Sequence, residues 1–428
     1  MRVLGLGTYD VRVHPRPGVI LSGLRRRGHA VRELNEPLGV GTADRIRALK
    51  DPRAAARFAG RLAAAWGRIA AGSRAYRGER SPDAILVGYL GHFDVLLARA
   101  LYPRARILLD HLVFASDTAA DRGLAGGGPT GRVKGLLLRG LDASALAAAD
   151  VVIVDTPEHL AMIPDRHRGK GIVVPVGAPP AWPAAAARRR AADAQEASGR
   201  SVGQAAFEWS DAQADGRGPT RTDGPREAGS AGRARSDGPR EAGSAGRARS
   251  DGRISVVFFG LFTPLQGAPV IARALAECER RGVGLDVTLV GDGQDAGDVR
   301  RLLPRGGGVS VTWLDWVDCA DLPGLVARHD ICLGIFGTSD KARRVVPNKA
   351  YQGIAAGCAL VTSDTPPQRA VLGDAAVFVP PGDPSALACA LASLADPASL
   401  AQARARSSAA AERFRPETVV AGLAEVLA

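Results

Sequence analysis

Short apolar runs alternate with stretches of helical periodicity along most of the chain. In the first 180 residues the apolar runs lie at 3–7, 30–34, 84–89, 107–110, 151–155 and 172–176. Helical stretches between them are predicted at 18–28, 44–76 and 141–149. The alternation resumes at residue 254, with apolar runs at 254–259, 285–290, 309–314, 331–336, 359–363 and 376–379. Such a pattern is typical of parallel sheets covered by helices on both faces. It predicts an α/β protein of two Rossmann-like domains that face each other across a cleft.

The pattern stops between residues 183 and 252. This segment is rich in Ala, Gly, Arg, Ser and Asp, and it contains a near-perfect tandem repeat at 222–235 and 236–249. A 14-residue unit of this composition cannot bury enough apolar surface to offset the entropy of ordering it. We therefore expect a first domain at 1–182, a disordered linker at 183–252 and a second domain at 253–410. The remaining residues, 411–428, are expected to form a C-terminal helix that packs back on the first domain.

The composition narrows the class of protein. No apolar run approaches the roughly 20 residues that cross a bilayer, and the N-terminus reads as a first strand without the apolar core of a signal peptide. The five cysteines lack metal-ligand spacing, so reduced thiols in a cytoplasmic protein are expected.

The positive charge is concentrated in the N-terminal half. Residues 1–180 hold 27 Lys and Arg against 16 Asp and Glu, whereas residues 253–428 hold 17 against 18. Such asymmetry favours an anionic partner, either a membrane surface or an acidic substrate. Nucleic acid is disfavoured because the aromatic residues expected of a single-strand binder are missing. The helical stretch 44–76 has an apolar stripe and a basic stripe, formed by Lys50, Arg53, Arg57, Arg61 and Arg68. It either packs on the domain core or lies on a membrane surface.

The stretch 331–364 combines features of an anion site. A strand leads into a loop that carries Lys341, Arg343 and Arg344, and Pro347 then opens a helix that ends at Gly357. Unpaired N–H groups at such a helix N-terminus, beside three cations, suit a phosphate or diphosphate. An ordinary solvated basic loop is the alternative.

Four loops of the second half, after residues 259, 290, 314 and 336, meet at one edge if the sheet is parallel. A nucleotide across the carboxyl ends of the strands is the default expectation for such a sheet. Neither first turn, at residues 5–8 or at residues 260–263, completes a G-x-G-x-x-G that leads straight into a helix, and no Walker A motif is present.

Several segments together resemble the retaining GT-B glycosyltransferases of family 4, the glycosyltransferase group 1 type. In the second half they are GLFTPLQG (260–267), LVGDGQD (289–295), VPNKAYQGIAAGCALVTSD (346–364) and VFVPPGDPSALACAL (377–391). In the first half they are LSGLRRRGHAV (21–31), AADVVIVDTPEHL (148–160) and IVVPVGAP (172–179). The resemblance implies an acceptor-binding first domain and a second domain that binds a nucleotide-sugar donor.

The resemblance also implies roles for individual residues. Gln352 stands where the family has a glutamate that binds the donor ribose, and Arg344 stands at the place of the other family glutamate. The residues expected around the donor diphosphate are Gly7, Gly260, Lys341, Arg343, Arg344, Val346 and Asn348. Lys349 either adds to this group or is merely exposed. Gly291 and Trp316 are expected at the nucleobase.

The catalytic residue implied by the family is His111, which follows a strand and is expected to face the cleft; a structural role is the alternative. His92 and Asp117 are candidate acceptor contacts, and Asp117 is equally a candidate helix N-cap. The other histidines, among them His14 and His159, read as structural or exposed. No D-x-D motif is present, which favours a site without metal or cofactor.

The resemblance therefore implies a glycosyltransferase that retains the anomeric configuration, and the missing D-x-D motif favours a metal-independent reaction. Its donor would be a nucleotide-sugar, and its acceptor a glycan, a lipid or a small molecule. The basic first half favours an anionic or lipid-linked acceptor and a peripheral place at the inner membrane face. Two alternatives stay open: a nucleotide-sugar 2-epimerase, and a degenerate GT-B protein that binds nucleotide-sugars without turnover.

Overall fold

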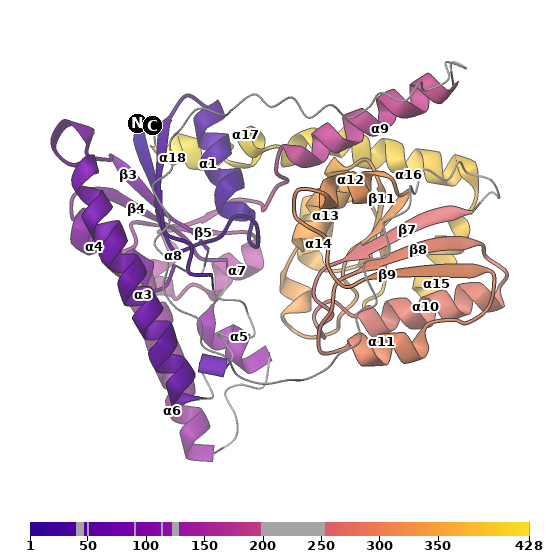
Figure 1. Cartoon of the computed structure of the whole chain (residues 1–428), viewed down its shortest axis with the longest axis horizontal. Coiled ribbons are helices and arrows are strands. Elements are labelled where there is room, and N and C mark those ends of the chain that lie inside the picture. Colours follow the sequence, from indigo (N-terminus) through magenta and orange to yellow (C-terminus); the bar gives the residue numbers. More distant parts are fainter. Residues whose placement is uncertain are drawn as a thin grey trace, which may run out of the picture. The chain divides into compact units, whose positions relative to one another are not determined.

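The computed structural model describes residues 1–39, 47–48, 51–89, 91–112, 114–121, 128–197 and 253–427. Residues 1–189 and 253–428 belong to one compact unit, which contains two six-stranded parallel sheets. The first sheet is built from the N-terminal half and the second from the C-terminal half (Figure 1). This confirms the predicted α/β architecture of two Rossmann-like halves.

The first sheet has the strand order β2-β1-β3-β4-β5-β6. Its strands are β1 (Arg2–Gly7), β2 (Ala30–Asn35), β3 (Ala84–Val87), β4 (Arg106–Asp110), β5 (Val151–Val154) and β6 (Gly171–Val173). The helices of this half are α1 (Arg16–Arg26), α3 (Pro52–Gly72), α4 (Asp94–Leu101), α5 (Ala115–Asp121), α6 (Gly128–Ala148), α7 (Pro157–Met162) and α8 (Asp165–Arg168), with short 3-10 turns at Ser73–Tyr76 and Gly78–Arg80.

Helices cover both faces of this sheet because successive strand residues point to opposite sides. Val3 belongs to the cluster that contains Ile20 and Leu24 of α1. Leu4 belongs to the cluster that contains Ile69 of α3 and residues of α4 and α6. Gly23 of α1 permits the close packing on one side, since a Cβ there would lie 2.2 Å from the carbonyl oxygen of Pro416.

The second sheet has the order β12-β11-β10-β7-β8-β9. Its strands are β7 (Ile254–Phe259), β8 (Leu285–Val290), β9 (Val309–Leu314), β10 (Ile331–Leu333), β11 (Ala359–Ser363) and β12 (Ala376–Val379). The helices are α10 (Ala268–Arg280), α11 (Ala296–Leu302), α12 (Leu322–Ala327), α13 (Asn348–Ala355), α14 (Pro366–Leu372), α15 (Pro384–Ser393) and α16 (Pro397–Ala410), with 3-10 turns at Ala342–Arg344, Gly373–Ala375 and Ala411–Phe414.

The C-terminus returns to the first half. After α16, the chain forms α17 (Pro416–Val419) and α18 (Ala421–Leu427). Val420 and Leu423 of this segment are fully buried in the same cluster as Val3 and Ile20. The last residues thus complete the core on one face of the first sheet.

Two segments differ from the sequence expectation. The linker was expected from residue 183, but α9 runs through Ala181–Ala197, because its alanines favour a helix and Pro183 fits the first turn. Residues 198–252, which include the tandem repeat, lie outside the described residues. Helix α6 begins at Gly128 rather than at residue 141. Its four glycines, at positions 128, 131, 135 and 140, weaken the helical pattern in the sequence.

Three of the five cysteines, Cys278, Cys332 and Cys358, are buried, and all five are unpaired. Among the described residues, no single helix is both long and apolar enough to cross a bilayer. Pro384–Ser393 and Pro397–Phe414 meet that test only as a pair, bent by 103°.

Candidate functional site

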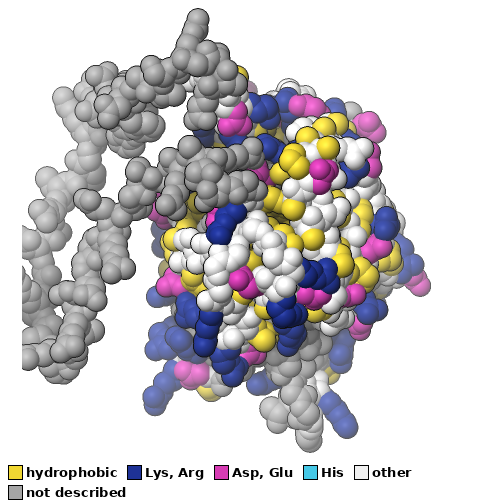
Figure 2. All heavy atoms as spheres, turned by 90° about the vertical axis from the view of Figure 1, so that its right-hand side faces the viewer, with side chains coloured by type: hydrophobic (Ala, Val, Ile, Leu, Met, Phe, Trp, Pro, Cys, Tyr) yellow, Lys and Arg dark blue, Asp and Glu magenta, His cyan; other side chains and the backbone are white. Residues whose placement is uncertain are grey.

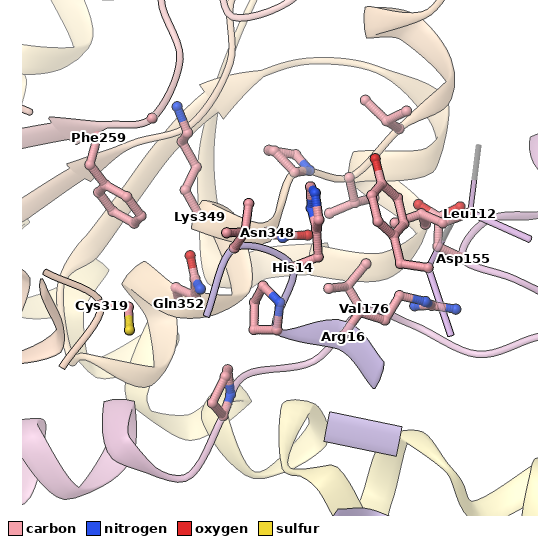
Figure 3. Close-up of a pocket in the computed structure, with 18 of the residues that line it drawn as sticks. His14, Arg16, Leu112, Asp155, Val176, Phe259, Cys319, Asn348, Lys349 and Gln352 are labelled. Carbon is pink, nitrogen blue, oxygen red and sulfur yellow. The ribbon is translucent and has the colours of Figure 1, made fainter. Parts of the chain in front are cut away.

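A pocket of about 610 Å³ is lined by residues from both sheets of the compact unit. Figure 3 shows Phe259, Lys349, Asn348 and Gln352 of the second half around it, together with His14, Arg16, Leu112 and Asp155 of the first. Its volume lies within the range of about 300–1,000 Å³ that small-molecule sites occupy. The pocket adjoins the carboxyl ends of β7 and β5, the edge where ligands of parallel sheets bind.

Lys349 is the buried cation of this pocket. Only 5% of the residue is exposed, and its Nζ lies 3.7 Å from the centroid of the Phe258 ring. The ammonium donates a hydrogen bond to Oε1 of Gln266 over 2.5 Å, and within the described residues no carboxylate forms an ion pair with it. Burial lowers the pKa of Lys349 to about 7. An anion in the pocket would therefore meet a cation that is poorly neutralised.

The N-terminus of α13 opens into the same pocket. Pro347 is its N-cap, and no side chain caps the first turn. Asn348 and Lys349 in that turn line the pocket, and so does Gln352 one turn later. An uncapped helix N-terminus presents N–H donors and a partial positive charge, which together favour a phosphate group.

Glycine is required where the loop after β7 approaches this helix. Gly260 has φ of +127°, and a Cβ there would lie 3.4 Å from Nζ of Lys349. A Cβ at Gly291 would lie 2.1 Å from the carbonyl oxygen of Gly260. Gly291 was expected at the nucleobase but does not line the pocket; it lets the two loops pack against each other.

The structure brings five of the residues expected at the donor into the pocket: Gly260, Lys341, Val346, Asn348 and Gln352. Of the two alternatives for Lys349, the exposed one is wrong, because the side chain is buried with its Nζ over the rings of Phe258 and Phe259. Arg343 is exposed and does not line the pocket.

Two cations of the basic loop are engaged by α5 of the first half. Nη2 of Arg344 donates to Oδ1 of Asp117 over 2.8 Å, and Nζ of Lys341 donates to Oγ1 of Thr118 over 2.9 Å. Oγ1 of Thr156 also donates to the backbone carbonyl of Arg344. Arg344 does not line the pocket, so its expected place at the diphosphate is not met. Asp117 is a partner of Arg344 and not a helix N-cap.

Gly7 does not line the pocket either. In the turn that follows Gly7, the backbone N–H and the hydroxyl of Thr8 both donate to Oδ2 of Asp94 over 2.8 Å. Trp66 donates to the other oxygen of Asp94. Asp94 thus satisfies the donors that were expected to meet the donor phosphates.

Trp316 lies on the surface, 77% exposed, and does not contact the pocket. Its expected role at the nucleobase is therefore not supported by its position, which follows from the polar loop after β9. The apolar end of the pocket is formed instead by Phe259, Cys319, Leu322 and Pro323. Trp182 stacks on Phe259 with ring centroids 5.6 Å apart.

His111 is buried below the pocket surface, 1% exposed, and its neighbour Leu112 lines the pocket in its place. The ring packs edge-on against Phe114 and lies 5.0 Å from that of His92. Burial, and then the neighbouring His92, lower the pKa of His111, so its imidazole is neutral at pH 7. The expectation that His111 faces the cleft is not met, and its catalytic role stays a prediction.

His92, His111 and Asp142 form a buried group whose ligand atoms lie within 4.8 Å of one another, a set suited to a transition metal by residue type. The carboxylate of Asp142 already accepts hydrogen bonds from the protein. It accepts bonds from the backbone N–H groups of Ala115 and Ser116 and from the Ser116 hydroxyl, and Nε2 of His92 lies 3.1 Å from it. Asp142 thereby anchors the N-terminus of α5. The candidate acceptor contact His92 is part of this anchor and does not line the pocket.

Two polar groups of the first half, missed from the sequence, line the pocket. Nε of the buried Arg16 donates to Oδ1 of Asp110 over 2.7 Å, while Nη1 and Nη2 lack hydrogen-bond partners among the described residues. Nδ1 of His159 lies 2.5 Å from Oδ1 of Asp155, so His159 belongs to a buried dyad. The one sequence signal for His159 as a site residue was its place in the first turn of a helix that follows a strand. Arg16 and Asp110 are 94 residues apart, so nothing in the sequence indicates that they pair.

Comparison with known proteins agrees with this geometry. Residues 253–396 match the family Glycosyl transferases group 1. No curated protein matches the chain.

Solved structures share the fold at low sequence identity. HepE from Anabaena in complex with UDP and glucose is 12% identical, with a TM-score of 0.57 over 100% of this chain and 98% of that one. Sucrose-phosphate synthase from Thermosynechococcus elongatus is 13% identical, with a TM-score of 0.56 over 100% and 97%. A UDP-forming trehalose-phosphate synthase from Burkholderia xenovorans is 13% identical, with a TM-score of 0.52 over 85% and 77%. The chain therefore has the GT-B fold, and its residues 253–396 are similar to the Glycosyl transferases group 1 family.

Proposed function

We propose that this protein is a glycosyltransferase that moves a sugar from a nucleoside-diphosphate donor to an acceptor bound by its first half. The observation that carries the proposal is the juxtaposition of Lys349 with the uncapped N-terminus of α13 in one pocket. Both features favour negative charge, and a leaving nucleoside diphosphate develops negative charge as the glycosidic bond breaks.

The proposed donor pose follows from the pocket. The diphosphate lies at the first turn of α13, beside Lys349 and Gly260. Gln352, one turn further, hydrogen-bonds the ribose hydroxyls as donor and acceptor. The base lies against Leu322, Pro323 and Phe259 at the apolar end. UDP-glucose is the first donor to test, since solved structures of HepE contain UDP and UDP-glucose.

The acceptor lies on the side of Arg16, His14 and the Asp155–His159 dyad. Asp155 fixes the orientation of His159, whose ring is then available to accept a hydrogen bond from an acceptor hydroxyl. The unpaired Nη atoms of Arg16 supply donors for an acceptor oxygen. We further propose retention at the anomeric carbon and a metal-independent reaction, in which Lys349 and the helix N-terminus carry the leaving-group charge.

Calorimetric titration with UDP, GDP and ADP tests the donor site first, and the proposal requires micromolar-range binding of one of them that Lys349→Met weakens. Transfer from the matching nucleotide-sugar to a panel of acceptors then tests catalysis. Proton NMR of the product reports the anomeric configuration, and an unchanged rate in excess chelator is expected for a metal-independent site. Absence of binding by every nucleotide would overturn the proposal.

Two alternatives give different outcomes in the same experiments. An epimerase converts the donor sugar when no acceptor is present, which NMR of the donor alone detects. A degenerate protein binds the nucleotide-sugar and turns over neither donor nor acceptor. Gln352 stands where the family has a glutamate, and an amide binds hydroxyls less strongly than a carboxylate does. This replacement favours testing the alternative of a protein that binds nucleotide-sugars without turnover.

A further inference from the structure

Helix α6 exposes an apolar stripe that the described residues of its half do not cover. Val133 is 56% exposed, Leu136 65% and Leu137 68%. These positions, spaced by three and four residues, share one face of the helix. Farther along α6, Ala145 and Leu146 are buried in the core beneath the sheet. Among the described residues, no other helix carries three large exposed apolar side chains.

The polar residues beside this stripe are basic. Arg132 and Arg139 are exposed, and Lys134 lies between them. Residues 128–141 of α6 contain no acidic residue, and Asp142, the first one, is buried. The first half as a whole is also basic, since residues 1–180 hold 27 basic against 16 acidic residues and α3 exposes Arg53, Arg57 and Arg61.

The second half differs in both respects. Its residues 253–428 hold 17 basic against 18 acidic residues, and Figure 2 shows both signs interspersed on the face that it views. Its large exposed apolar side chains before the C-terminal helices, Leu261 and Trp316, are single and far apart in the sequence. Scattered exposed residues of this kind are normal on a soluble protein, whereas a contiguous stripe is not.

We propose that α6 docks the first half on an anionic phospholipid surface. Val133, Leu136 and Leu137 enter the acyl boundary, while Arg132 and Arg139 contact the lipid phosphates. An apolar stripe with flanking cations is the combination by which an interfacial helix binds such a surface. The basic charge and the exposed apolar side chains of α6 therefore both fit an anionic phospholipid surface. This docking rests on the proposed glycosyltransferase function only in what it serves: it would hold the enzyme at a membrane that carries a lipid-linked acceptor.

Vesicle flotation of the full chain tests the docking. Phosphatidylcholine vesicles are compared with vesicles in which a third of the lipid is phosphatidylglycerol. The wild type is expected to float with the anionic vesicles only, and Leu136→Asp/Leu137→Asp is expected to reduce the bound fraction about tenfold. Arg132→Glu/Arg139→Glu should do the same, and the remaining binding should lose its dependence on salt.

Matched controls lie in the second half. Trp316→Asp introduces an equally exposed acidic residue, and Arg280→Glu/Arg305→Glu reverses two exposed charges; both should float like the wild type. The proposal is overturned if the wild type does not float, or if the α6 variants float as well as the controls do. Nucleotide binding, measured without lipid, is expected to be the same in all these variants. That measurement shows that they are folded, and it separates a failure of docking from a failure of the donor site.

Discussion

Nη2 of Arg344 lies 2.8 Å from Oδ1 of Asp117, and this ion pair joins the basic loop of the second half to α5 of the first. Asp142 anchors the N-terminus of the same helix. The loop is thereby held against α5 of the first half. Arg344, one of the cations that the sequence analysis assigns to the donor diphosphate, is paired within the protein, whereas Lys341 and the buried Lys349 line the pocket.

Replacing Lys349 with Met should weaken nucleoside diphosphate binding by about 10–100-fold, because a hydrogen bond to a charged group contributes about 1.5–3 kcal/mol. The free energy of unfolding should be retained or should rise, since a buried charge is replaced by an apolar side chain of similar length. Titration calorimetry and urea denaturation measure the two effects. Arg343→Met is the matched control: its side chain is exposed, and binding should stay as in the wild type. Equal losses in both variants would contradict the assignment.

Nucleotide affinity should fall as the pH rises above 7. The pKa of Lys349 is about 7 in the free protein because of burial, and a bound diphosphate raises it. Binding therefore takes up a proton, and the affinity drops by up to about tenfold per pH unit between the free and the bound pKa. The ligand charge is nearly constant above pH 7.5, since the last phosphate pKa is about 6. Calorimetry at pH 7.5, 8.5 and 9.5 measures the slope, and Lys349→Met should remove it.

Breaking the Arg344–Asp117 pair should affect stability only slightly. The two side chains are 28% and 19% exposed, so Arg344→Met should lower the free energy of unfolding by about 0.5–1 kcal/mol. Nucleotide affinity should be unchanged, because Arg344 does not line the pocket. The reversed pair Arg344→Asp/Asp117→Arg should regain part of the lost stability in denaturation experiments. A large loss of nucleotide affinity would instead show that Arg344 reaches the diphosphate when ligand binds.

Removing Arg16 should be costly. Arg16 and Asp110 are both about 1% exposed, and a lone buried carboxylate costs about 3–5 kcal/mol. Arg16→Met should lower the unfolding free energy by about this amount, while Arg16→Met/Asp110→Asn should lose clearly less. Denaturation curves of the two variants give the comparison, and equal losses would show that the pair contributes no coupling.

The proposed base-binding end of the pocket can be tested with two apolar residues, one that lines the pocket and one that lies outside it. Trp316→Ala should leave nucleotide affinity as it is, because the side chain is 77% exposed and outside the pocket. Leu322→Asp should weaken binding by about tenfold, because it places a charge at the apolar end of the pocket. The reverse order of effects in a competition assay would restore the nucleobase position expected from the sequence.

The architecture could be read from the sequence because strand and helix periodicities are local. The runs at 254–259 and 285–290 recur as β7 and β8 with the same bounds. Helix α13, whose N-terminus lies at the pocket, was readable for the same reason, since Pro347 and Gly357 delimit one continuous stretch. Only the second part of α6, from residue 141, was predicted, because the glycines of the first part weaken the helical pattern in the sequence.

Pairing between distant residues could not be read. Asp94 satisfies Thr8 from 86 positions away, and Asp117 pairs with Arg344 across 227. Both carboxylates remove groups from the expected donor site, and neither spacing leaves a pattern in the sequence. The sequence left open whether Lys349 joins the diphosphate group or is merely exposed, because a lysine in a helix usually is exposed. Only the rings of Phe258 and Phe259 beneath it show that it is buried.

The packing of α17 and α18 has a consequence for how the protein is made. Val3, Ile20 and Leu24 share one core cluster with Val420, Leu423 and Leu427, the last residues of the chain. On the ribosome, one face of the first sheet is therefore covered by α1 alone until residues 416–427 have been translated. The N-terminal half cannot complete its core as an early folding unit, and a truncation before residue 416 would leave the same apolar face open to aggregation.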